Sequence, residues 1–192
     1  MKRELLWDPC LDLVGNRLPN CFVDRRAGST RGETKRIAAL AVGLVSGEGV
    51  VLYPEGTRFS EHKRDRVLQR LQRQGDPELL RCAEALHHVL PPRTAGALAL
   101  IDSAPEADVV FFAHTGFEGA SSFADIFQGT MIGSAVRARY WATSAESIPR
   151  DSRERKRWLF GEWQKVESIV ADWSSRNNEH RLHQHCNHLQ ND

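Results

Sequence analysis

The chain has 192 residues, a length that suits one domain with a sizeable core. Its 26 basic and 25 acidic residues leave a formal net charge of +1, so no overall positive field indicates a nucleic-acid partner. Its four cysteines are scattered and form no C-x-x-C pair, which fits a reducing cytoplasm and a chain without a disulfide framework.

The first part of the chain predicts a strand, a helix and a second strand. Cys21, Phe22 and Val23 form a short apolar strand, and Thr30 and Glu33 have the spacing of a capping box that opens a helix. Residues 50–53 (VVLY) are β-branched, apolar or aromatic, and a glycine-rich turn precedes them. This order favours two parallel strands joined by a crossover helix.

The remaining elements are mostly helical. We expect a basic helix over residues 61–74, a helix that begins at Asp76–Pro77 and continues to Leu90, and a short apolar helix over 94–101. Residues 109–113 (VVFFA) predict a buried strand, 136–141 a late edge strand and 151–173 a long amphipathic helix. We therefore predict an α/β fold over residues 1–173, with a central mixed, mostly parallel sheet flanked by helices, and a polar, disordered tail over 174–192.

The residues after the second predicted strand have groups that could bind a ligand. Gly56 lets a ligand approach the backbone, Thr57 offers a hydroxyl, and Arg58 offers a planar fork that suits phosphate or carboxylate. The alternative is a structural turn in which Glu55 and Arg58 only pair with each other. The segment YPEGTRFS resembles the third conserved block of the phospholipid/glycerol acyltransferase family, F/Y-P-E-G-T-R-S.

Two further stretches are similar to blocks of that family. In CFVDR, Phe22 and Arg25 fall on the F-x-x-R positions and Asp24 on the position between them that is commonly acidic or neutral, which implies that Arg25 binds the acceptor phosphate. LPPRTAG resembles L-P-R-T-x-G, which implies that Arg93 is a further acceptor contact, although a Pro–Pro turn also explains this stretch. VVFFAH occupies the place of the fourth block without its usual proline, and the resemblance covers residues 2–127.

The family's first block, H-x-x-x-x-D, is not found in the chain. The family's histidine acts as general base on the acceptor hydroxyl, yet none of the eight histidines has an aspartate five positions on. We therefore expect the chain to begin after the catalytic block and to be N-terminally incomplete. His114, at the end of a predicted strand, is the one substitute base with plausible geometry, and its commoner role is structural.

The resemblance implies transfer of an acyl group from acyl-CoA or acyl carrier protein to the hydroxyl of a lysophosphatidic acid, a related lysophospholipid or glycerol phosphate. It implies no metal and no organic cofactor. No uncharged apolar run approaches the ~18 residues that span a bilayer, so we expect a cytoplasmic location, free or on the inner face of a membrane. The alternative function is that of an inactive homologue that binds phospholipid or a protein partner through the same half-site.

Overall fold

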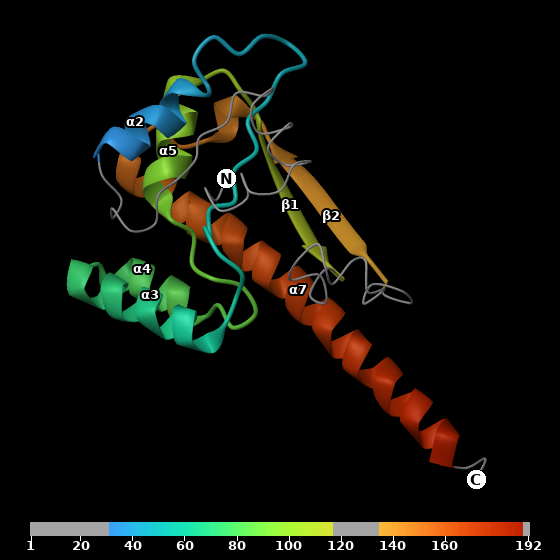
Figure 1. The fold of residues 1–192 in the computed structure, drawn as a ribbon. Helices are drawn as coiled ribbons and strands as arrows, with labels where there is room; N and C mark the ends of the chain where they lie inside the picture. The colour runs from blue at the N-terminus through green and yellow to red at the C-terminus, as the bar shows by residue number, and fades with distance from the viewer. Residues whose placement is uncertain (1–30, 117–134, 190–192) are drawn as a thin grey trace, which may run out of the picture. The chain divides into compact units, whose positions relative to one another are not determined.

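The computed structural model describes residues 31–116 and 135–189 (Figure 1). In chain order the elements are α2 (Arg31–Ala39), α3 (Glu61–Gln74), α4 (Pro77–Glu84), α5 (Thr94–Ser103), β1 (Val109–Thr115), β2 (Arg137–Thr143), the 3₁₀ turn η2 (Ala145–Ser147) and α7 (Ser152–Leu189). These residues cluster into two compact units. The first unit contains residues 31–57, 92–107 and 144–156, and the second contains 58–91, 108–116, 135–143 and 157–189.

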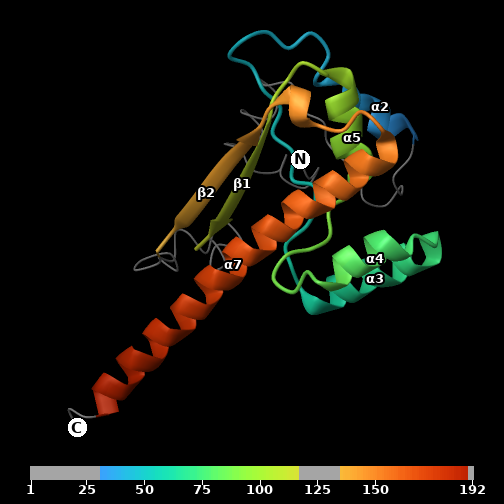
Figure 2. The ribbon, with the colours of Figure 1, turned by 180° about the vertical axis from the view of Figure 1, so that it is seen from behind.

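The first unit is built on the contact between α2 and α5, which lie side by side (Figure 2). Gly96 of α5 allows the approach, because a Cβ at this position would lie 3.3 Å from Cδ1 of Ile37. The Arg155 guanidinium joins the end of α5 to the segment before α7. It pairs with Asp102 and donates hydrogen bonds to the carbonyl oxygens of Pro149 (2.6 Å) and Arg150 (3.0 Å).

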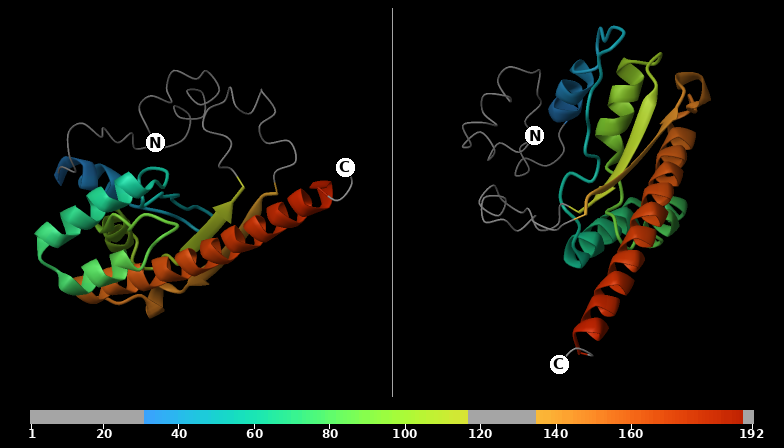
Figure 3. Two further views of the ribbon diagram at one scale, coloured as in Figure 1. Left: turned by 90° about the horizontal axis from the view of Figure 1, so that it is seen from below. Right: turned by 90° about the vertical axis from the view of Figure 1, so that its right-hand side faces the viewer.

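In the second unit, α3 and α4 form a helical hairpin (Figure 3). Gly75 ends α3 in the left-handed conformation, with φ of +73°, and its N–H returns to the carbonyl of Gln72. Asp76 then caps α4 by accepting hydrogen bonds from the N–H groups of Glu78 and Leu79, and Pro77 occupies the first helical turn. The core of this unit gathers Leu71, Leu79, Ala83 and Phe160.

The sheet of the second unit is an antiparallel pair, in which Phe111 lies opposite Trp141 and Phe112 opposite Tyr140. Its inner face packs on α7, since the Phe111 ring stacks on Trp141 at 5.5 Å and meets the edge of Trp158 at 5.6 Å. The Trp141 Nε1–H donates to the buried carboxylate of Glu162 over 2.7 Å.

The predicted fold class is wrong for the described residues. They are mostly helical and contain one two-stranded antiparallel sheet, not a central, mostly parallel sheet flanked by helices. Residues 50–53 form no strand, and Val51 and Tyr53 are 81% and 75% exposed. β-Branched and aromatic residues favour extended backbone, but a strand also needs a partner, which tertiary context decides. The other predicted strand of the parallel pair, residues 21–23, lies outside the described residues.

The helices were predicted in the right places but with different ends. The helix that begins after Asp76 stops at Glu84 instead of continuing to Leu90. Beyond it, Arg64 Nη2 donates to the carbonyl of Glu84 and Arg64 Nε to that of Leu86 (2.6 and 2.5 Å), which satisfies carbonyls at this helix end. At the other end of the chain, α7 continues to Leu189, beyond the predicted helix end at residue 173.

Candidate functional site

The residues after the 50–53 segment form a tight turn. The N–H of Gly56 donates to the carbonyl of Tyr53 over 3.0 Å, with Pro54 as the second residue of the turn. No described residue other than glycine has a positive φ, so Glu55 has the conformation of a type I turn, which favours Pro and Gly at these positions. Gly56 itself is left-handed, with φ of +70°. Glu55, Gly56 and Thr57 are half-buried.

Arg93 lies across this turn. Its N–H donates to the carbonyl of Pro54 over 2.9 Å. A Cβ added to Gly56 would stand 3.2 Å from Arg93 Nε and 3.3 Å from Cζ, so the guanidinium occupies the space that the missing side chain leaves. The Arg93 side chain is exposed. We call the turn of residues 54–57 together with Arg93 the Gly56–Arg93 site; it lies entirely within the first unit.

The chemistry of this site favours an oxyanion. A guanidinium presents its donors in a planar fork that matches phosphate or carboxylate. Arg93 is also the N-cap residue of α5 and makes no side-chain cap hydrogen bond. The N-terminal N–H groups of a helix carry partial positive charge, which adds to the preference for an anion. The exposed Arg93 guanidinium, beside the N-terminus of α5, can therefore contact a phosphomonoester.

The other predicted site residues are distributed differently. Phe22, Asp24 and Arg25 lie outside the described residues. Arg58 belongs to the second unit, where its side chain is exposed and its carbonyl accepts a hydrogen bond from Lys63 Nζ over 3.0 Å. His114 also belongs to the second unit, on the exposed face of β1, with its ring 5.9 Å from that of Phe112. Of the predicted site residues that it describes, the structure thus brings Gly56 and Arg93 into contact.

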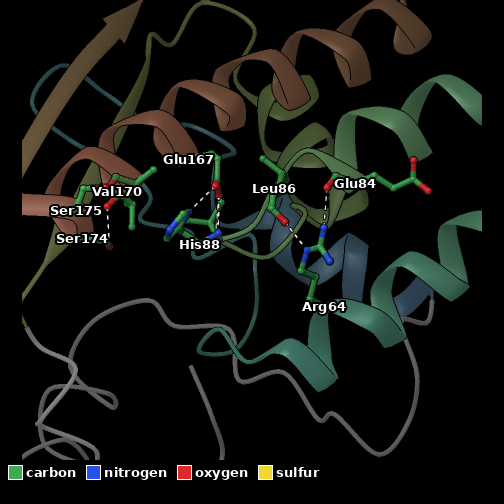
Figure 4. Close-up of polar contacts among 10 residues, drawn as sticks. Arg64, Glu84, Leu86, His88, Glu167, Val170, Ser174 and Ser175 are labelled. Carbon is green, nitrogen blue, oxygen red and sulfur yellow. Dashed lines mark hydrogen bonds and ion pairs between the residues drawn. The ribbon is translucent and has the colours of Figure 1, made fainter. Parts of the chain in front are cut away.

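One histidine–carboxylate pair was not predicted (Figure 4). The ring Nδ1 of His88 lies 2.7 Å from Oε1 of Glu167, and Oε2 accepts from the main-chain N–H groups of His88 (2.8 Å) and Val89 (3.1 Å). Burial opposes the charge on this carboxylate, but the hydrogen bonds from His88 outweigh it and hold the pKa of Glu167 below its ordinary value. No local motif could have revealed the pair, because 79 residues separate its members.

The His88–Glu167 pair has a clear structural role. Trp163, one turn before Glu167 on α7, donates its Nε1–H to the carbonyl of Leu90 over 2.9 Å. Together with Arg64, these contacts fix the segment between α4 and α5 at several points (Figure 4). The carboxylate also orients the imidazole through this contact, as in acid–base pairs.

Comparison with known proteins assigns this chain to no family. No family model matches the chain, and neither a curated protein nor a solved structure matches it. Within residues 32–116 and 135–176, whose side chains the structure describes, no group of three or more histidine, cysteine or acidic side chains is placed to hold a metal ion. Among the helices of the described part of the chain, none is long and apolar enough to cross a bilayer.

Proposed function

We propose that this chain binds the phosphate of a lysophospholipid or glycerol phosphate and takes part in acyl transfer to that molecule's hydroxyl. The observation that carries the proposal is the Arg93 guanidinium lying directly over Gly56, 3.2 Å from where a Cβ would stand. These two residues come from YPEGTRFS and LPPRTAG, two of the described stretches that resemble the acyltransferase family, and their contact supports a shared site.

The reaction sets the requirements on the site. The acceptor hydroxyl oxygen attacks the thioester carbonyl of acyl-CoA or acyl carrier protein, the C–S bond breaks, and an ester and a thiol form. The hydroxyl proton passes through a base to the leaving thiolate, so no oxidant, reductant or metal is required. The proposed contribution of the Gly56–Arg93 site is to fix the acceptor by its phosphate, which lowers the barrier by positioning.

A second candidate is binding without turnover. The sequence feature that favours it is that no histidine of the chain stands in an H-x-x-x-x-D block, the source of the base in the family it resembles. In this case the same half-site would retain a phospholipid, or an anionic segment of a protein partner, and release it unchanged. A lysophospholipid or phospholipid ligand, in either case, would bring the chain to the cytoplasmic face of a membrane.

Two assays, one of glycerol 3-phosphate binding and one of ester formation, distinguish the two candidates. The proteins compared are the wild type, the Arg93→Ala variant and the control variant Arg36→Ala. Arg36 is an exposed arginine of α2 in the same unit, so its loss changes the charge equally. We expect Arg93→Ala to weaken glycerol 3-phosphate binding by about tenfold, the effect of one charge-assisted hydrogen bond, and Arg36→Ala to leave it unchanged. Ester formation from oleoyl-CoA and lysophosphatidic acid by the wild type would establish transfer, whereas binding without product would establish the second candidate. Equal affinities of all three proteins for glycerol 3-phosphate would refute both.

A further inference from the structure

Two exposed side chains with large apolar surfaces directly precede the turn of the Gly56–Arg93 site. Val51 is 81% exposed and Tyr53 is 75% exposed, whereas Leu52 between them is half-buried. Such alternation is typical of extended backbone, in which every second side chain points to the same side. We call these two side chains the Val51–Tyr53 pair; they belong to the first unit, and water covers most of their surface.

The turn brings Tyr53 close to the proposed phosphate position. The carbonyl of Tyr53 accepts the hydrogen bond from the N–H of Gly56 over 3.0 Å, so these residues are the first and the last of the turn. The Cα atoms of two such residues lie within about 7 Å of each other. The Arg93 guanidinium lies against Gly56, 3.2 Å from where a Cβ would stand. Tyr53 is therefore a near neighbour of the donors that are proposed to bind phosphate.

A lysophospholipid carries its apolar chain at a matching distance from its phosphate. About six covalent bonds separate the phosphorus from the carbonyl carbon of the acyl ester, and an extended chain of this length spans roughly 7 Å. Exposed side chains change rotamer within nanoseconds, so the Tyr53 ring can follow an acyl chain that begins at this distance. Glycerol 3-phosphate has no apolar group there, so it gains nothing from the Val51–Tyr53 pair.

We propose that the Val51–Tyr53 pair contacts the acyl chain of the acceptor, so that the site selects a lysophospholipid over glycerol phosphate. This inference rests on the proposed function, because the Gly56–Arg93 site must hold the phosphate, and it decides between the two acceptors that the proposed function leaves open. The driving force is the release of water from hydrocarbon and from the exposed aliphatic and aromatic side chains. Val51 and Tyr53 thus determine specificity, whereas Arg93 supplies the charge.

The test compares two ligands in calorimetric titrations of the full chain: glycerol 3-phosphate and hexanoyl lysophosphatidic acid, whose short chain keeps it dissolved. We expect the wild type to bind the hexanoyl ligand about tenfold more tightly, the effect of removing about two methylene groups from water. The ratio of the two affinities should fall to about one in Val51→Ser/Tyr53→Ser, which removes the apolar surface. It should stay at about tenfold in the control Val42→Ser/Val45→Ser, which replaces two other exposed side chains of the first unit.

The outcomes separate this inference from the proposed function. If neither ligand binds, the proposed function fails and the inference fails with it. If glycerol 3-phosphate binds but the two ligands bind the wild type equally, or if the preference persists in Val51→Ser/Tyr53→Ser, the inference alone is overturned and the phosphate site stands. Sedimentation in which the wild type self-associates and this variant is monomeric would also overturn it, because a second copy of the chain would then cover the pair. Circular dichroism checks that the variant is folded, and Tyr53→Ser alone takes its place if it is not.

Discussion

The substitution Gly56→Ala tests the geometry of the Gly56–Arg93 site most finely. At φ of +70° an alanine is strained by about 1–2 kcal/mol, while the reduced freedom of the unfolded chain returns about 0.4–1 kcal/mol, so the net loss of stability is about 1 kcal/mol. The new Cβ also stands 3.2 Å from Arg93 Nε, closer than the ~3.5–4.0 Å of an ordinary carbon contact. The guanidinium must move by a few tenths of an ångström. This movement costs little stability, but it displaces the guanidinium donors from the position in which they would bind the phosphate.

Gly43→Ala is the matched control, because Gly43 has φ of +77° in the same unit and nothing within 4 Å of its would-be Cβ. We expect both variants to lose about 1 kcal/mol in urea unfolding. Of the two, Gly56→Ala alone should bind glycerol 3-phosphate more weakly than the wild type in titration calorimetry, by less than the about tenfold expected of Arg93→Ala. If Gly56→Ala and Gly43→Ala bind glycerol 3-phosphate equally well, the contact between Gly56 and Arg93 plays no part in binding and the reasoning is refuted.

Three further predictions concern stability in the second unit. Asp76→Ala removes the two hydrogen bonds that cap α4 and should cost about 1 kcal/mol in urea unfolding, whereas Ser60→Ala, at an N-cap without a side-chain bond, should cost almost nothing; equal losses would contradict the capping account. Phe160→Ala empties a site that is 1% exposed and should cost about 3–5 kcal/mol, and a loss below ~1 kcal/mol would mean that α7 does not complete this core. Glu167 has a lowered pKa in the folded chain, so its contacts with His88 stabilise the protein above the ordinary value of 4.5 and are lost as the pH falls through the folded pKa. Glu167→Ala should flatten this acid limb of the stability curve, and an unchanged limb would contradict the assignment.

Local signals in the sequence located the helices well. The pair Asp76–Pro77 correctly predicted the start of α4, whereas the apolar periodicity after it extended the helix beyond its end at Glu84. The strands show the limit of such signals. Residues 109–113 and 50–53 have similar apolar, β-branched compositions, yet the first pairs with β2 and the second forms no strand in the described structure. Composition specifies a preference for extended backbone, while pairing depends on segments far away in the sequence.

The candidate site was predictable only in part. Resemblance to the acyltransferase family pointed to Gly56 and to Arg93 separately. Their contact depends on the hydrogen bond from the Arg93 N–H to the carbonyl of Pro54, which no local pattern specifies. The His88–Glu167 pair was missed for the same reason, because it joins a bend after α4 to the middle of α7. Apolar periodicity likewise could not show that Phe112 and Tyr140 face outward, since both faces of the hairpin carry aromatic residues.

The most direct test of the central claim is calorimetric titration of the full chain with glycerol 3-phosphate and, in parallel, with glycerol. Both ligands are soluble, so no lipid enters the measurement. The Gly56–Arg93 site predicts saturable binding of glycerol 3-phosphate, about tenfold weaker in Arg93→Ala, and no binding of glycerol. Heats that do not saturate with glycerol 3-phosphate, or an Arg93→Ala variant that binds it as tightly as the wild type, would contradict the claim that this site recognises a phosphomonoester.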